Sequence, residues 1–258
     1  MRAILYLMSY LLILSFAEAE NEMIWQPKPG TTWQWQLQGE LDLSFEVEMY
    51  DLDLFDTPME TIQALQARGK KVVCYFSAGS FEPWRTDAEL FPKELIAKKM
   101  KGWDEWWLDI RNLDLLKPIM LARLDLAFEK GCDGVEPDNV DAFANDTGLK
   151  LSYEDQLAYN IFLAEAAHAR GLSIGLKNNL DQVKDLVPYF DWALNEECFY
   201  YRECQRLMPF IKADKAVFGV EYELDVQDFC PKANERGFSF LKKSWEVDAY
   251  REDCLGIK

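Results

Sequence analysis

Three carboxylates and one amide lie within six residues of the segment Glu136-Pro137-Asp138-Asn139-Val140-Asp141. Gly134 and Val135 lead into this segment and are typical of a short buried strand, so the strand ends directly in a cluster of acids. A strand that only packs a core has no reason to end this way, because water would normally hold that much charge. The segment therefore predicts an active site that works with carboxylates.

Composition excludes most chemistry based on histidine. The chain contains one histidine, His168, near the end of a predicted helix, where it interacts favourably with the helix dipole. Catalytic triads with histidine, histidine-rich zinc sites and two-histidine iron sites are therefore not expected. We expect no metal and no cofactor, and a reaction that runs on carboxylates, lysine, tyrosine or cysteine.

The net charge of −17 indicates which partners to expect. Nucleic acid is not expected, because phosphate binding needs clustered lysine and arginine. A strongly acidic protein attracts cations, which favours a cationic ligand. The alternative is that the charge only keeps an exported protein soluble.

Residues 1–19 have the pattern of a secretory signal peptide. Arg2 precedes an apolar run at residues 4–16, and Ala17-Glu18-Ala19 forms a cleavage site of small residues. An uncleaved anchor is the alternative, although the apolar run is short for a membrane span. We expect residues 20–258 to form a single domain that is secreted, periplasmic or at the cell surface, free of the membrane after cleavage, and monomeric.

Export makes disulfides available to the six cysteines of the mature chain. Their spacings match no zinc motif. Cys198 and Cys204 flank a five-residue loop and are the easiest pair to close. Cys230 and Cys254 both lie near the C-terminus and could pair. Cys74 and Cys132 either pair or stay as buried thiols.

Strand patterns alternate with helix patterns along the mature chain, which predicts parallel strands with helical crossovers. Eight such units in residues 20–258 favour a closed (β/α)8 barrel, the TIM barrel. An open doubly wound sheet is the alternative, but it lacks the glycine-rich nucleotide motifs. The predicted strands cover residues 32–37, 45–51, 71–77, 106–110, 134–138, 173–178, 192–196 and 216–222, and the clearest helices cover 57–68, 117–130 and 153–170.

In a barrel, side chains at the C-terminal ends of the strands line the active site. Six of the eight predicted strands bring a charged group to that rim. Acids in pairs beside tyrosine and asparagine are typical of a sugar site, because glycosidases need one protonated carboxyl and one ionised carboxylate. The candidate residues are Asp53, Tyr75, Asp109, Glu136, Asp138, Asn139, Lys177, Asn178, Glu196 and Glu221.

Two motifs are specific, Glu136-Pro137-Asp138-Asn139-Val140-Asp141 and Asn195-Glu196-Glu197-Cys198, and segments 33–37, 50–57, 73–80 and 175–179 support them. Together they resemble glycoside hydrolase family 114, the secreted endo-α-1,4-polygalactosaminidases. The resemblance implies a (β/α)8 barrel that cuts α-1,4-linked galactosamine polymers internally. It also implies that Asp138 is the nucleophile and Glu196 the acid/base. That polymer is a cationic amino-sugar polysaccharide, in agreement with the acidic composition.

Side-chain alternation leaves the partner of Asp138 open. Bulky Trp192 and Leu194 suit the side of their strand that faces the helices, and strict alternation then turns Glu197 rather than Glu196 inward. We keep Glu196 on the family pattern, because alternation often fails at the last residue of a strand. A nucleophilic Asp138 implies retention, which a carboxyl separation of roughly 5 Å would support and one of about 7–9 Å would oppose.

Two rival functions stay open. A non-catalytic polysaccharide-binding barrel would keep the acidic cup without the reaction. Lys177 could instead be the Schiff-base lysine of a lyase or aldolase. Its alternative role is an ion pair that holds Asp138 ionised.

Overall fold

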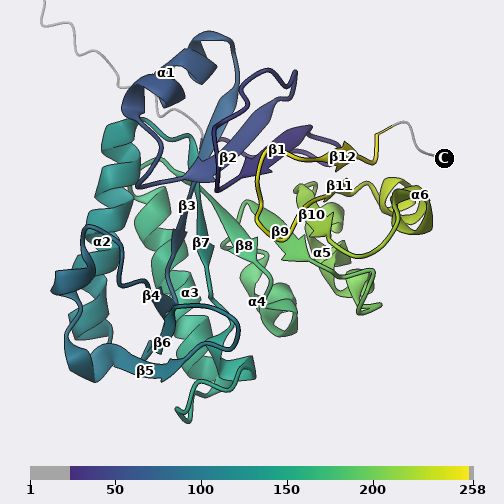
Figure 1. Cartoon of the computed structure of the whole chain (residues 1–258). Helices are drawn as coiled ribbons and strands as arrows, with labels where there is room; N and C mark the ends of the chain where they lie inside the picture. The colour runs from purple at the N-terminus through teal and green to yellow at the C-terminus, as the bar shows by residue number, and fades with distance from the viewer. Residues whose placement is uncertain (1–23, 256–258) are drawn as a thin grey trace, which may run out of the picture.

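Eight parallel strands form a curled sheet that is the framework of the protein (Figure 1). The computed structural model describes residues 24–255, so the predicted signal peptide at residues 1–19 lies outside the described residues. The parallel strands follow in the order β1 (Trp33–Gln36), β2 (Met49–Asp53), β3 (Lys71–Ser77), β7 (Gly134–Asp138), β8 (Ser173–Lys177), β9 (Trp192–Glu196), β10 (Val217–Glu221) and β11 (Ser239–Lys242). A short β12 (Glu252–Asp253) pairs with β11 in antiparallel orientation.

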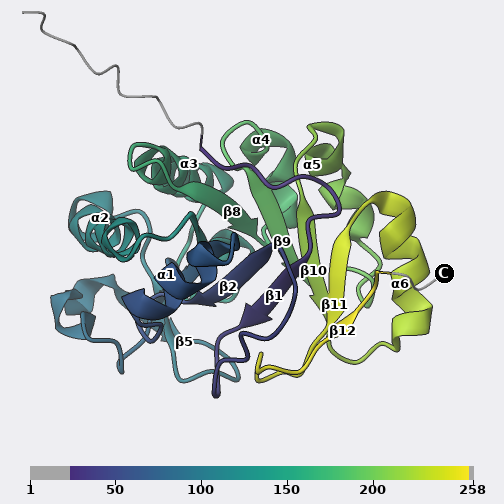
Figure 2. The ribbon, with the colours of Figure 1, turned by 90° about the horizontal axis from the view of Figure 1, so that it is seen from above.

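Helices connect most of these strands and lie around the outside of the sheet (Figure 2). The strand order follows the chain without reversal, which confirms the predicted (β/α)8 barrel, since a doubly wound sheet would reverse direction. No helix within residues 24–255 is long and apolar enough to cross a membrane. The helices are α1 (Met59–Ala67), α2 (Leu113–Lys130), α3 (Tyr153–His168), α4 (Val183–Leu186), α5 (Met208–Lys212) and α6 (Val226–Arg236), with 3-10 turns η1 (Ala88–Leu90), η2 (Lys93–Leu95), η3 (Ala142–Ala144), η4 (Leu180–Gln182) and η5 (Cys204–Leu207).

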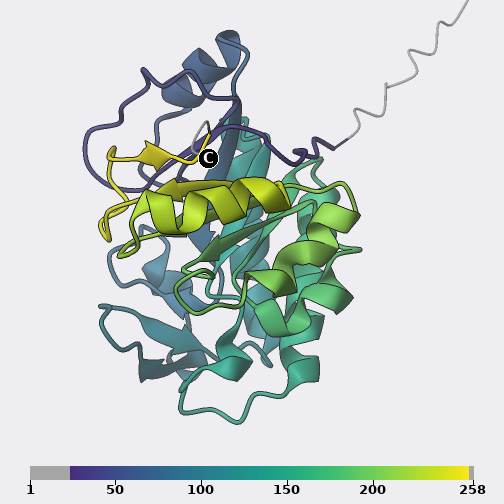
Figure 3. The same cartoon turned by 90° about the vertical axis from the view of Figure 1, so that its right-hand side faces the viewer.

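The seam between β1 and β11 closes without strand pairing in the part of the chain that the structure describes. The indole Nε1 of Trp33 donates to the carbonyl of Ser239 at 3.0 Å. The backbone N–H of Leu37 donates to the carbonyl of Val247 at 2.9 Å. Side chains and the segment after β11 therefore bridge this gap, and α6, yellow-green in Figure 3, packs against β11 on the outside.

The prediction that residues 106–110 form a strand of the barrel was wrong. Its residues form β6 (Trp106–Leu108), which pairs in antiparallel orientation with β4 (Ser80–Phe81) and β5 (Ile96–Lys99) in a separate sheet. This sheet is inserted between β3 and α2, with only 3-10 turns before β6. Its antiparallel pairing with β4 and β5 takes β6 out of the parallel barrel. The eighth barrel position belongs to β11, which the sequence patterns did not predict.

The barrel interior is filled by large side chains, and glycine makes room for them. Trp192 and Leu194 of β9 belong to the interior cluster, together with Trp33, Trp35 and Phe218. A Cβ on Gly175 of the neighbouring β8 would lie 2.3 Å from the Trp192 ring. The expectation that Trp192 and Leu194 face the helices was therefore wrong. Because alternate residues share a face, Glu196 rather than Glu197 points to the barrel axis.

All six cysteines are paired in three disulfides. The short-loop pair Cys198–Cys204 and the C-terminal pair Cys230–Cys254 are confirmed. Cys74 and Cys132, left open between a bond and buried thiols, form the third disulfide. This bond joins β3 to the residue two before β7, and so ties together two strands that carry site residues.

Candidate active site

A cleft of about 1030 Å³ opens at the C-terminal ends of the strands, where the sequence placed the site. It is lined by several of the predicted residues, and a second hollow of about 410 Å³ adjoins it. Six residues line both hollows: Trp103, Asp141, Asn178, Glu196, Tyr222 and Trp245. Space for a ligand therefore extends on both sides of Glu196.

Lys177 stands at the centre of the site, at the end of β8. Its Nζ lies 3.0 Å from Glu136 Oε1, 3.3 Å from Asp138 Oδ1 and 3.4 Å from Glu196 Oε2. Burial opposes the charge, but the three carboxylates outweigh it and raise the pKa of Lys177 well above its usual range. A Schiff-base lysine must be a neutral amine, so this environment disfavours the lyase alternative.

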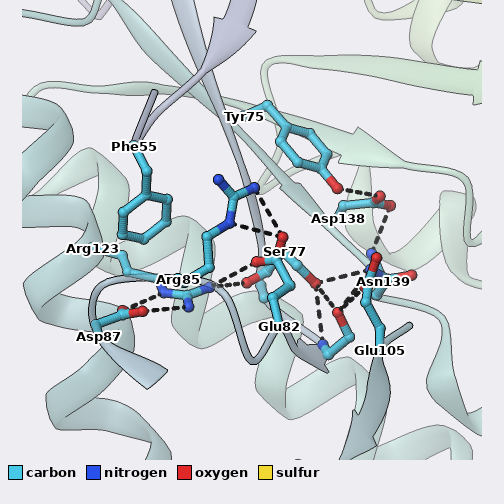
Figure 4. Close-up of polar contacts among 12 residues, drawn as sticks. Phe55, Tyr75, Ser77, Glu82, Arg85, Asp87, Glu105, Arg123, Asp138 and Asn139 are labelled. Carbon is cyan, nitrogen blue, oxygen red and sulfur yellow. Dashed lines mark hydrogen bonds and ion pairs between the residues drawn. The ribbon is translucent and has the colours of Figure 1, made fainter. Parts of the chain in front are cut away.

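Asp138 is held by five neighbours. Besides Lys177, the Tyr75 hydroxyl donates to its Oδ2 at 3.0 Å and the backbone N–H of Asn139 donates to its Oδ1 at 2.7 Å (Figure 4). The N–H groups of Ala78 and Gly79 donate to its backbone carbonyl. A Cβ on Gly79 would lie 1.7 Å from the Asn139 carbonyl, so only glycine permits this approach of the two loops.

Glu196 is fixed by hydrogen bonds from the residues that directly follow β8 and β10. Asn178 Nδ2 donates to its Oε2 at 3.0 Å, and the Tyr222 hydroxyl donates to its Oε1. Burial acts to raise the pKa of Glu196, but Lys177 and the hydrogen bonds from Tyr222 and Asn178 outweigh burial and lower it. Glu196 is therefore a carboxylate in the free protein at neutral pH.

The spacing of Asp138 and Glu196 is set by Lys177. One carboxylate oxygen of each residue contacts the same Nζ, at 3.3 and 3.4 Å. The distance between these two oxygens therefore cannot exceed the sum of the two contact distances. That limit falls within the roughly 6.5–9.5 Å of inverting enzymes and also admits the roughly 5–5.5 Å of retaining ones, so these contacts fit both classes.

Two further carboxyls lie below this pair, inside the barrel. Trp35 Nε1 donates to Glu136 Oε2 at 3.0 Å, and burial raises the pKa of Glu136 to about 7 against the opposing effect of Lys177. Asp51 of β2 is fully buried, and neither of its oxygens has a hydrogen-bond partner among the described residues. Burial and the neighbouring Glu136 raise the pKa of Asp51 well above its usual range, which favours its neutral form.

Most of the candidate residues meet in this cleft. Tyr75, Asn139, Lys177 and Asn178 line it beside Asp138 and Glu196, and Glu136 lies beneath Lys177. Asp53 also lines it, but both of its oxygens accept hydrogen bonds from Arg85, at 3.0 and 2.7 Å. Its charge is therefore already neutralised.

Two expectations of position were wrong. Asp109 follows β6 in the inserted sheet and does not line the cleft; it binds Arg111 instead, with Arg111 Nε donating at 2.8 Å. Glu221 of β10 is buried on the helix-facing side and accepts the N–H of Phe199 at 2.7 Å. The inward position at the end of β10 belongs to Tyr222, because residues two apart on a strand share a face and Val220 belongs to the interior cluster.

The sequence patterns missed several cleft residues. Tyr222 carried a usable signal, because it directly follows the candidate Glu221 at the end of β10, and so did Asp51, which lies beneath the cleft, two residues before the candidate Asp53 on β2. Glu105 and Arg85 carried none, because their positions depend on the inserted sheet. Two tryptophans that the sequence did indicate as possible sugar platforms, Trp84 and Trp103, also line the cleft, and they are 54% and 53% exposed, so their rings are accessible to a ligand. No group of three or more His, Cys, Asp or Glu within residues 24–255 is arranged to hold a metal ion.

Comparisons with known proteins point to one family. The model of the glycoside hydrolase family GH114 matches residues 15–258. The crystal structure of Aspergillus fumigatus Ega3 in complex with galactosamine is 41% identical, covers 89% of this chain and 97% of its own, and superposes with a TM-score of 0.85. No curated protein matches the sequence at a significant level.

Two more distant structures share the fold. The glycoside hydrolase domain of PelA from Pseudomonas aeruginosa is 12% identical over 86% of this chain and 97% of its own, with a TM-score of 0.69. An α-galactosidase from Thermus thermophilus is 12% identical over 87% of this chain and 59% of its own, with a TM-score of 0.55. At these identities the likeness concerns the barrel alone.

Proposed function

Because the chain belongs to glycoside hydrolase family GH114, we propose that it hydrolyses α-1,4-linked galactosamine polymers at internal bonds. The observation that carries the proposal is the pair Asp138 and Glu196, both bound to Lys177 in an open cleft. The similar Ega3 was solved with galactosamine, which supports an amino sugar as substrate. A cleft that continues on both sides of Glu196 suits a polymer that passes through.

The proposed reaction uses the two carboxylates in two steps. Asp138 attacks the anomeric carbon while Glu196 gives its proton to the leaving glycosidic oxygen. Water then attacks the ester between the sugar and Asp138, and Glu196 takes the proton of that water. Because Lys177, Tyr222 and Asn178 favour the ionised form of Glu196, the first step requires a pH low enough to protonate it. We therefore expect maximal activity on the acidic side of neutrality.

We also propose that residues 1–19 are a signal peptide, that the protein is exported, and that it acts as a monomer. Three disulfides support export, because such bonds persist in oxidising compartments. The acidic composition, with a net charge of −17, favours the approach of a cationic polysaccharide.

Product analysis on partly deacetylated galactosaminogalactan tests the function. The wild type should release oligosaccharides, and Asp138→Asn and Glu196→Gln should each lower the rate at least about 1,000-fold. Glu89→Gln is the control, because Glu89 is exposed and lies outside the cleft. Variants as fast as the wild type would refute these roles.

The same experiment separates the rivals. Binding without any release by the wild type would favour a non-catalytic binding barrel. A borohydride-trapped adduct on Lys177 would favour the lyase, whereas the glycosidase predicts none.

A further inference from the structure

Glu105 is a cleft residue outside the proposed reaction. It directly precedes β6 in the inserted sheet, and its side chain reaches the cleft near Asn139 (Figure 4). Only 9% of its surface is exposed, yet it lines the large hollow that also contains Asp138. It is therefore a buried carboxyl with access to a bound ligand.

A chain of hydrogen bonds fixes one oxygen of Glu105. Ser80 Oγ donates to Glu105 Oε2 at 2.5 Å and lies 2.5 Å from Ser77 Oγ, which in turn accepts from Asn139 Nδ2 at 2.8 Å. Each hydroxyl has one proton, so with Ser80 donating to Glu105, Ser77 donates to Ser80. All three donors then point towards Glu105, an arrangement that suits an ionised acceptor. The same Asn139 donates its backbone N–H to Asp138, so Glu105 is held in a fixed position relative to Asp138.

The second oxygen of Glu105 is free. Oε1 makes no hydrogen bond within residues 24–255, and it is not sealed off as a buried unpartnered atom. Glu105 also forms no ion pair with a lysine or arginine in that range. By contrast, Asp53 has Arg85, and Asp138 and Glu196 have Lys177.

A buried carboxylate without a cationic partner is unfavourable, so a cation on the ligand would stabilise it. Burial raises the pKa of Glu105 to about 7, against the opposing hydrogen bond from Ser80. A cation at Oε1 would restore the ionised form and satisfy the remaining oxygen. The 2-ammonium group of galactosamine is such a cation, whereas the acetamido group of an acetylated unit carries no charge.

We propose that Glu105 is a substrate-binding residue that pairs with the 2-ammonium group of the galactosamine unit beside Asp138. This pair makes the enzyme select deacetylated units at that position. The inference rests on the proposed function and assigns to one side chain the choice between amino and acetamido sugars.

The test compares two substrates made from one pool. Deacetylated α-1,4-galactosamine oligomers are divided, and one half is N-acetylated chemically. Glu105→Gln should lower kcat/KM on the deacetylated half by about 10- to 100-fold, as expected for a charged hydrogen bond, and change the acetylated half by less than about threefold. Glu105→Asp, which keeps the charge but withdraws it by one methylene, should fall between. Glu89→Gln, the same substitution on an exposed residue, should leave the ratio unchanged.

Binding separates this inference from the function. Titration of both oligomer halves into Asp138→Asn, with and without Glu105→Gln, measures selectivity without turnover. Loss of the preference for deacetylated oligomers in the double variant would support the role of Glu105 even if the wild type cleaved neither substrate. An equal loss on both substrates, with an unchanged melting temperature, would overturn the proposal and leave Glu105 a structural residue.

Discussion

Replacing Tyr222 with phenylalanine should shift the pH dependence of catalysis in a defined direction. The Tyr222 hydroxyl donates to Glu196 Oε1 and helps to lower the pKa of that carboxyl. Phenylalanine keeps the aromatic ring that stacks on Trp245, with ring centroids 4.1 Å apart. The substitution therefore removes the hydrogen bond and little else.

The size of the shift follows from the contacts that stay. A hydrogen bond to a charged group contributes about 1.5–3 kcal/mol, and water replaces part of it because the Glu196 side chain is 28% exposed. Lys177 and Asn178 continue to favour the carboxylate. A net loss of about 1.4 kcal/mol raises the pKa of Glu196 by about one unit.

The assay is kcat/KM on deacetylated oligomers across pH. Glu196 must carry a proton to act as the acid, so activity falls as pH rises through its pKa. Tyr222→Phe raises that pKa, and the alkaline limb should move about one unit towards higher pH. Tyr250→Phe removes a tyrosine hydroxyl bound to Glu252 outside the cleft and should leave the limb in place. An unmoved or acid-shifted limb for Tyr222→Phe would refute the role given to Glu196.

Two further predictions concern stability. If Asp51 is a neutral acid, Asp51→Asn replaces it by a neutral amide, so the free energy of unfolding should change by less than about 1 kcal/mol at pH 7. Asp51→Ala leaves a cavity and should lower the free energy of unfolding by more. Urea denaturation measures both variants, and a large loss in Asp51→Asn would mean that Asp51 is ionised. Replacing Cys74 and Cys132 together with alanine opens a loop of 58 residues and should lower the free energy of unfolding by about 4 kcal/mol, with Cys198 and Cys204 as the short-loop comparison, for which a smaller loss is expected.

The sequence was sufficient for the barrel and for most of its rim, because alternation of strand and helix patterns is a local property. It was insufficient where a position depends on a distant neighbour. Trp192 faces inward because Gly175 on the next strand leaves space, and nothing near Trp192 in the chain indicates this. That single inversion is why alternation favoured Glu197 over Glu196.

The other errors in the predicted site come from the inserted sheet and from the side-chain alternation of β10. The run at Trp106 looks like a barrel strand, but the inserted sheet takes it out of the barrel and takes Asp109 with it. The same sheet brings Glu105 into the cleft, which no local motif could predict. On β10 a one-residue difference in phase exchanged Glu221 for Tyr222 at the inward position.

The configuration of the first-formed reducing ends tests the central claim most directly. Proton NMR of the wild type on deacetylated α-1,4-galactosamine oligomers resolves α from β anomers before they interconvert. Nucleophilic attack by Asp138 predicts internal cleavage that produces α ends first, and no such signal with Asp138→Asn. Ends that appear first as β would contradict Asp138 as a nucleophile, and the absence of cleavage would contradict the proposed function.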